Sequence, residues 1–347
     1  MMRTTANMFL IFSAAAVFVL AAFAQSPSFE QAMQLFQQHR WAEAAVAFAQ
    51  CEQNTPGKTA APLYRGKALV NLGKFEAAAA ALETYQATHP QSDDAAYLLA
   101  YIRFRQNQPK ESLKLFTAAA RLHNPTADDL KVVALDYVLL GDYDDAARYL
   151  EESLALNPEN VEARYHLGRV RYQQNRFDLA IAAFQEVLRR EPGNVKAEDN
   201  LGLSLEAKNE VEAALVAYRA AVKLTENLPV QNEQPYLNLG ALLAKSGRTE
   251  EAIPLLARAS TIAPSSGKTH YQLAKAYFDL NRLEDASKEA KKAVALDQRE
   301  SADHYLLGRI YQRSGMGELA KEQFRITEQL IHSKSSSSSG MASGVPH

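Results

Sequence analysis

The chain is dominated by a helical pattern that repeats at a fixed spacing and is clearest over residues 161–192. Small residues such as Gly168 and Ala180 alternate with large apolar residues such as Phe184, and Asn175 separates the two halves of the segment. This period predicts two amphipathic helices joined by a tight turn. Because the small residues allow a close approach, we expect the two helices to pack against each other as a hairpin.

The same pattern recurs in phase along nearly all of the chain after residue 24. Glycine or asparagine recurs at the turn, where a positive φ ends the first helix, and proline recurs where the second helix ends. One hairpin cannot bury its apolar face alone, so neighbouring hairpins must stack to form a continuous core. The small residue of the first helix recurs as Gly66, Ala100, Ala134, Gly202, Gly240, Ala274 and Gly308.

This spacing resembles the tetratricopeptide repeat, a helix–turn–helix unit of 34 residues. The resemblance implies an all-α fold, a right-handed superhelical solenoid of about nine repeats over residues 25–332. Two helices in each repeat make about eighteen helices, and no strands are expected. Residues 333–347 are rich in Ser and Gly and are expected to form a disordered tail. The repeat frame shifts slightly at His123-Asn124-Pro125.

Residues 1–24 are predicted to be a signal peptide. Arg3 precedes an apolar run over residues 8–22, and the segment ends in the small-residue pattern that signal peptidase recognises. Cleavage after this pattern would make Gln25 the first mature residue, and the first repeat begins at the same place. The alternative is that residues 8–24 stay attached as a membrane anchor, since the apolar run approaches a bilayer-spanning length. We therefore expect an exported protein, periplasmic or extracellular, with membrane association only if this segment is uncleaved.

Charge, cysteine content and motifs exclude several functional classes. With 38 Lys and Arg against 40 Asp and Glu, the chain has no overall basic surface for nucleic acid. Cys51 is the single cysteine, so no internal disulfide can form. The sequence has no phosphate-binding loop, dinucleotide fingerprint, zinc-protease motif or Cys–His cluster. We therefore expect no enzyme activity, cofactor, metal or small-molecule substrate. His166, His270 and His304 are expected on the surface or in a groove.

The resemblance also implies where a partner binds. In this family the first helices of successive repeats line a concave groove that holds a protein or peptide. Tyrosines interleaved with Lys and Arg suit an extended peptide, because the rings contact apolar side chains and the cations pair with carboxylates. The candidate groove residues are Tyr97, Tyr101, Phe104, Arg105, Lys131, Tyr165, His166, Arg169, Tyr172, Lys196, Asn200, Asn238, Tyr271, Lys275, Tyr305 and Arg309.

Two irregularities leave alternatives open. An insertion of about four residues around Leu228–Asn232 either lengthens a helix or forms a loop, and it is either neutral or a partner contact. The last repeat lacks a polar capping helix and ends in apolar residues such as Leu330 and Ile331. The leading hypothesis is an exported, non-enzymatic scaffold that binds a partner in the groove. The alternative is an assembly factor of a bacterial envelope or secretion complex. It would act through the convex face or the terminal repeat, where an oligomer could also form.

Overall fold

The computed structural model describes residues 28–54 and 60–341, with side chains up to residue 334. This part of the chain contains eighteen helices and no strand, so the predicted all-α architecture is confirmed. The predicted signal peptide and residues 342–347 of the predicted tail lie outside the described residues. The chain divides into two compact units, residues 1–123 and 124–347. Their boundary coincides with the shift in the repeat frame.

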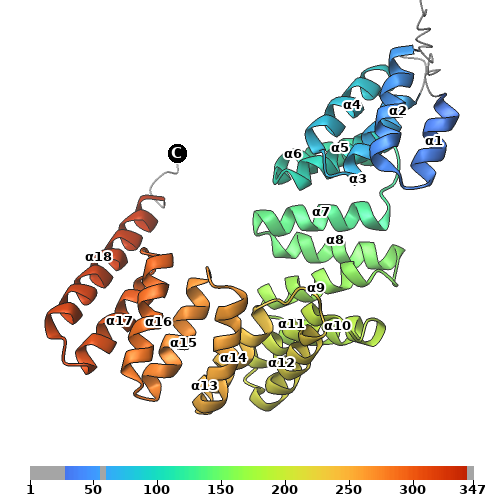
Figure 1. Cartoon of the computed structure of the whole chain (residues 1–347). Helices are drawn as coiled ribbons and strands as arrows, with labels where there is room; N and C mark the ends of the chain where they lie inside the picture. The colour runs from blue at the N-terminus through green and yellow to red at the C-terminus, as the bar shows by residue number, and fades with distance from the viewer. Residues whose placement is uncertain (1–27, 55–59, 342–347) are drawn as a thin grey trace, which may run out of the picture. The chain divides into compact units, whose positions relative to one another are not determined.

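The first unit contains three helical hairpins that follow one another along the chain (Figure 1). Its core combines buried alanines with an aromatic group in which Phe36, Phe48 and Tyr64 lie with ring centroids 5.6 to 6.3 Å apart. The helices are α1 (Phe29–Gln37), α2 (Trp41–Asn54), α3 (Ala61–Asn71), α4 (Phe75–Thr88), α5 (Asp93–Arg105) and α6 (Pro109–Ala120).

The second unit contains six hairpins, and each helix packs on the next one along the chain (Figure 1). Successive first helices, such as α9 and α11 or α11 and α13, also contact each other. The helices are α7 (Ala127–Leu140), α8 (Tyr143–Leu156), α9 (Val161–Gln173), α10 (Phe177–Arg190), α11 (Val195–Ala207), α12 (Val211–Glu226), α13 (Gln234–Lys245), α14 (Thr249–Ile262), α15 (Gly267–Asp279), α16 (Leu283–Leu296), α17 (Ser301–Arg313) and α18 (Gly317–Met341).

The two helices of a hairpin approach closely where a small residue of the first faces a large residue of the second. A Cβ built on Gly168 would lie 2.7 Å from the ring of Phe184, and one on Gly202 would lie 2.5 Å from the ring of Tyr218. These distances are too short for carbon–carbon contact, so a side chain at either glycine would push the helices apart. Phe184 and Tyr218 are fully buried, and the close approach therefore builds the core.

Each hairpin turns through a single residue with a positive φ angle. Asn175, for example, has φ 57° and Gly141 has φ 78°, which confirms the predicted role of Asn and Gly at the turn. In the first hairpin this residue is His39, with φ 58°, which the repeat pattern did not identify. The positive φ residues are His39, Gly73, Asn107, Gly141, Asn175, Asn209, Gly247, Asn281 and Gly315.

Two segments depart from the regular repeat pattern: the insertion before α13 and the C-terminal end of α18. The insertion both lengthens a helix and forms a loop: α12 has 16 residues, against 14 in α8, α10, α14 and α16, and residues 227–233 form a loop before α13. Helix α18 continues to Met341, and residues 333–341 are therefore helical where the sequence predicted a disordered tail. No proline interrupts this serine-rich stretch, and serine is only moderately poorer than alanine as a helix former, so the backbone hydrogen bonds can continue.

The expectation that His270 and His304 lie on the surface or in a groove is wrong, because both are buried. The His270 Nδ1 lies 2.6 Å from the Glu289 carboxylate, and its Nε2 lies 3.1 Å from a backbone carbonyl. The His304 Nδ1 lies 2.8 Å from the side-chain oxygen of Gln323. Through its Nδ1, each ring thus links the first helix of its repeat to the second.

Because the two helices of a hairpin approach closely, adding a single methyl group at the contact should lower the stability of the fold. Gly202→Ala should lower the free energy of unfolding by about 1–2 kcal/mol net, because the clash with Tyr218 exceeds the better helix propensity of alanine. Gly193→Ala is the control, since a Cβ there meets nothing within 4 Å among the described residues, and it should change stability by less than about 0.5 kcal/mol. Urea unfolding followed by circular dichroism measures both, and equal stability of the two variants would contradict the prediction.

Candidate functional site

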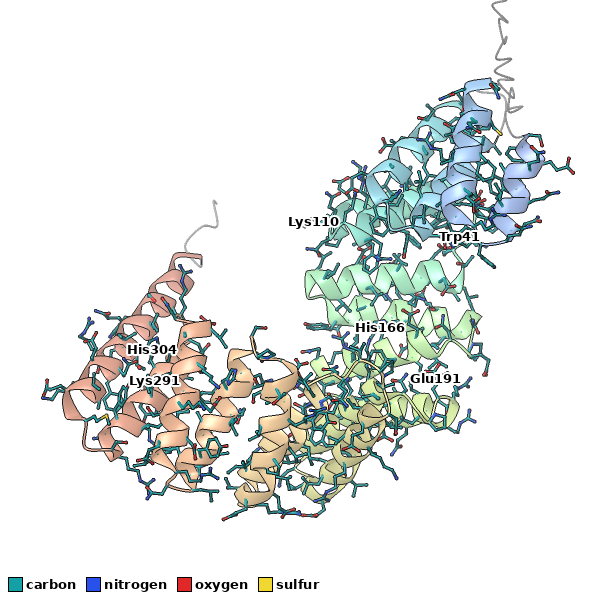
Figure 2. All side chains as sticks on the ribbon, in the orientation of Figure 1. Trp41, Lys110, His166, Glu191, Lys291 and His304 are labelled. Atoms are coloured by element: carbon teal, nitrogen blue, oxygen red, sulfur yellow. The ribbon has the colours of Figure 1, made fainter. Side chains whose placement is uncertain are left out.

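A cavity of about 600 Å³ lies in the second unit, between the first helices of three successive repeats. This volume is within the range of protein ligand sites. Figure 2 labels two residues of its lining, His166 on α9 and Glu191 just after α10. The lining comes from α9, α11, the first turn of α13 and the segments that precede them. It comprises Val161, Glu162, Tyr165, His166, Arg169, Glu191, Asn194, Val195, Lys196, Asp199, Asn200, Asn232, Gln234 and Pro235.

Asparagine N-caps stabilise the first turns of α9 and α11. The side-chain oxygen of Asn160 accepts a hydrogen bond from the Ala163 backbone at 3.0 Å, and that of Asn194 accepts one from the Ala197 backbone at 3.0 Å. Such caps satisfy backbone donors that have no partner within the helix. Both helices start beside the cavity, and their N-terminal halves present side chains to it.

Two cations of the cavity have no ion-pair partner among the described residues. Arg169 and Lys196 are exposed and form no salt bridge in this part of the chain. The acidic side chains nearby do have partners. Glu162 forms an ion pair with Lys131 at 2.7 Å, and Glu191 accepts a hydrogen bond from Asn194 at 2.8 Å. Arg169 and Lys196 therefore remain available to pair with an acidic group of a ligand.

Lys131, one of the predicted groove residues, already forms ion pairs within this protein. Its ammonium group also lies 3.0 Å from Asp128 on its own helix, so it bonds to two carboxylates at once. Burial alone would lower its pKa, but the hydrogen bonds to Glu162 and Asp128 outweigh burial, and the pKa is raised. Lys131 consequently serves to hold α7 against α9 through Glu162.

A buried polar network forms the floor of the cavity. The Asn238 side-chain amide donates to both oxygens of the Asp199 carboxylate, at 2.9 and 3.0 Å. Gln234, at the start of α13, donates to the Asn238 side-chain oxygen at 2.7 Å. Burial raises the pKa of Asp199 to about 6, although the bond from Asn238 opposes this shift. The network joins α11 to α13 below the cavity.

Tyr165 and His166 supply aromatic surface on the α9 side. The Tyr165 hydroxyl accepts a hydrogen bond from the Asn200 amide at 3.2 Å, which orients the ring across the gap between α9 and α11. Burial, assisted by the nearby cations Arg169, Lys131 and Lys196, lowers the pKa of His166 to about 4, even though Glu162 opposes the shift. His166 is therefore a neutral ring at neutral pH.

The structure brings five of the sixteen candidate residues into this cavity and places the others elsewhere. Tyr97, Tyr101, Phe104 and Arg105 lie on α5 in the first unit. There the Tyr97 hydroxyl donates to the His123 carbonyl at 2.6 Å, and Arg105 donates to the Tyr101 hydroxyl at 2.6 Å. These side chains make local contacts within the first unit.

The remaining candidates also lie outside the cavity. Tyr172 contacts the ring of Phe177, with centroids 5.6 Å apart, and Asn238 contributes to the floor beneath the cavity. The lining residues that the sequence reasoning missed are Val161, Glu162, Glu191, Asn194, Val195, Asp199, Asn232, Gln234 and Pro235.

Candidates near the end of the array form a separate group. Lys275 on α15 lines a smaller cavity of about 280 Å³. The Arg309 guanidinium stacks over the Phe278 ring at 4.9 Å, and Tyr305 is half exposed. Tyr271 is only partly buried against the apolar cluster there. The two cavities share no lining residue.

The described residues contain neither a metal site nor a membrane-spanning helix. No group of His, Cys, Asp or Glu in residues 28–54 and 60–341 is arranged to hold a metal ion. No described helix combines the length and the apolar character needed to cross a bilayer.

The pattern of the tetratricopeptide repeat family matches residues 63–125, 134–195, 167–232, 200–267 and 243–310. The chain therefore belongs to the tetratricopeptide repeat family, whose members are scaffolds that bind protein or peptide partners and are generally non-enzymatic.

Two curated relatives cover only part of this chain. The BBSome complex member BBS4 of Bos taurus is 35% identical over 107 residues, which are 30% of this chain and 21% of that protein. The BBS4 protein of Xenopus tropicalis is 35% identical over 86 residues, 25% of this chain and 17% of that protein. The chain thus matches about a fifth of the length of these relatives.

Three solved structures share the fold at low sequence identity. The Cut9–Hcn1 hetero-tetramer of APC/C has a TM-score of 0.58 at 16% identity, over 81% of this chain and 54% of that one. A tetratricopeptide repeat protein of Parabacteroides merdae has a TM-score of 0.57 at 18% identity, over 72% and 97%. PilW, a type IV pilus biogenesis factor, has 0.52 at 22%, over 57% and 90%. These likenesses show the solenoid fold alone.

The neutral state of His166 predicts a pH-dependent contribution to stability. Its pKa is about 4 in the fold, against about 6.5 in the unfolded chain, so between these values only the unfolded chain binds the proton. The free energy of unfolding should fall as the pH drops from 7 to 4, by about 3 kcal/mol relative to the His166→Gln variant. Asp199 titrates in both proteins, so its contribution cancels. Parallel stability curves from chemical denaturation would contradict the prediction.

Proposed function

We propose that this protein is an exported, non-enzymatic scaffold that binds a partner polypeptide in the cavity between α9, α11 and α13. The observation that supports this most directly is the lining of the cavity. Tyr165, His166 and Asn200 offer ring faces and an amide, while Arg169 and Lys196 offer unpaired positive charge. An extended chain can satisfy both kinds of group, because it carries apolar and charged side chains on opposite faces.

Family membership supports this kind of function, and the relatives give it context. BBS4 is a member of the BBSome complex, and PilW is a pilus biogenesis factor. The matches to both are partial or distant, so the identity of the partner is open to experiment. Family membership favours a polypeptide over a small metabolite as the ligand of this cavity, because members of the family bind protein or peptide partners.

A second candidate function has its own supporting observation at the terminal repeat. Met316, Leu319 and Ile331 are each about half exposed at the turn and surface of α18, although they are large apolar residues. Such residues mark protein contacts when they gather on one surface. We therefore retain, as the alternative, an assembly factor of a bacterial envelope or secretion complex that acts through the terminal repeat or the convex face.

Reversing one charge in the cavity distinguishes between the two proposed functions. Arg169→Glu should weaken partner binding by at least about tenfold, because it replaces an attractive charge by a repulsive one. Arg219→Glu on α12 is the charge-matched control, since Arg219 is exposed and lies outside the cavity lining. Crosslinking in the native compartment with mass spectrometry identifies the partner, and pull-down measures retention by each variant.

The opposite result would favour the alternative. If Arg169→Glu retains the partner while polar replacement of Leu330 and Ile331 abolishes assembly, the terminal repeat is the working surface.

Export is a separate proposal that rests on the sequence of residues 1–24. We expect the mature protein to begin at Gln25, because cleavage follows the small-residue pattern at the end of the apolar run. Mass spectrometry of the N-terminal peptide from the native host measures this directly. Recovery of an intact Met1 in the membrane fraction would instead support the uncleaved anchor over residues 8–24.

A further inference from the structure

The loop between α12 and α13, residues 227–233, differs in length from the equivalent connections of the second unit. The other four connections from a second helix to the next first helix span residues 157–160, 191–194, 263–266 and 297–300. The α12–α13 loop is therefore longer than any of them, and it lies at the repeat junction that borders the cavity.

This loop supplies one wall of the cavity. Asn232 lines the cavity, and Gln234 and Pro235, which follow the loop directly, line it too. Two hydrogen bonds hold the end of the loop in place. The Arg258 guanidinium of α14 donates to the Gln231 side-chain oxygen at 2.5 Å, and the Gln234 backbone donates to the Asn232 side-chain oxygen at 3.0 Å. The wall is thus attached to α13 and α14.

The same loop carries apolar side chains that are exposed to solvent. Val230 is 81% exposed and Leu228 is 44% exposed. Val230 precedes the lining residue Asn232 by two positions, so their Cα atoms are at most about 7 Å apart. Removing such surface from water is favourable, and a ligand that leaves the cavity on this side can bury it.

The lining of the cavity also carries two cationic side chains. Arg169 on α9 and Lys196 on α11 have no ion-pair partner among the described residues, whereas Glu162 is paired with Lys131. Glu191 and Asp199 are hydrogen-bonded only by neutral amides and keep their negative charge, but Asp199 is 6% exposed and faces Asn238. A ligand carboxylate placed beside Arg169 and Lys196 therefore meets positive charge that no carboxylate of this protein pairs with.

We propose that the cavity takes an extended segment of a partner polypeptide in which acidic side chains stand next to apolar ones, and that the α12–α13 loop selects the apolar residue. The inference rests on the proposed function, because it specifies the ligand of the same cavity. Arg169 and Lys196 attract the carboxylates, and Val230 contacts the apolar side chain. The loop is thereby the specificity element of the site.

Three fluorescein-labelled peptides of ten residues test the charge requirement. The first alternates pairs of Glu and Leu, the second replaces each Leu by Ser, and the third replaces each Glu by Lys. Fluorescence anisotropy with the mature chain should give the tightest binding for the Glu–Leu peptide, weakened by added salt. The double variant Arg169→Glu, Lys196→Glu should weaken both acidic peptides by at least about tenfold. Tighter binding of the Lys–Leu peptide would overturn the proposal.

A loop variant tests the selection of the apolar residue. Val230→Ser should weaken the Glu–Leu peptide by about threefold to tenfold and leave the Glu–Ser peptide unchanged, because one apolar contact is lost. Val216→Ser on α12 is the control, since Val216 is also largely exposed but lies outside the cavity lining. It should change neither affinity. An unaltered ratio of the two affinities in Val230→Ser would show that the loop does not select the ligand.

The failure of this inference can be distinguished from failure of the proposed function. If Arg169→Glu releases the crosslinked native partner but the Val230→Ser variant binds all ligands as before, the role of the loop is wrong and the cavity remains the binding site. If Arg169→Glu keeps the native partner, the proposed function itself is wrong. Circular dichroism of each variant establishes that the helices are intact, and the high exposure of Val230 makes a folding defect at that position unexpected.

Discussion

The contact between a small residue on the first helix of a hairpin and a large apolar residue on the second is the constraint on which the rest of the structure depends. At Gly202 the ring of Tyr218 occupies the space that a Cβ would need, and at Gly168 the ring of Phe184 does so. Close packing of this kind tolerates little change in volume. It fixes the distance between the two helices of each repeat, so the next repeat stacks in a defined position.

The cavity is a consequence of that stacking. Where first helices of successive repeats lie side by side, side chains that do not enter the core meet across the gap between them. In the second unit this places Tyr165 of α9 within hydrogen-bonding distance of Asn200 on α11. The floor carries a buried carboxylate, Asp199, whose burial would be costly without the two hydrogen bonds that it accepts from Asn238. A regular apolar core and a polar floor therefore lie side by side in the same repeats.

The α12–α13 loop shows how a repeat array acquires an individual feature. Repeats that join through short connections present similar surfaces, but the longer loop brings Asn232 and the exposed Val230 to the edge of one cavity. The hydrogen bond from Arg258 holds this loop against α14, so the departure from regularity is ordered. Loops that a rigid scaffold positions in this way commonly carry function.

The sequence by itself determined the all-α repeat architecture, because small residues, turn residues and large apolar residues recur at one spacing. It also predicted the turn residues except His39, whose positive φ is set by its place in the hairpin and not by its residue type. The candidate site was predicted only in part. Repeat positions identify the face on which Tyr165, Arg169 and Lys196 lie, but they treat all repeats as equivalent.

Only the tertiary structure decided which of these residues share a cavity. Asp199, Asn232 and Gln234 were missed because their role depends on contacts between repeats and on the path of the inserted loop. Likewise, His270 was expected at the surface, yet Glu289 of the facing helix makes its burial favourable. A periodic pattern specifies the contacts within a repeat, whereas a site is built from side chains that come together only when different repeats pack.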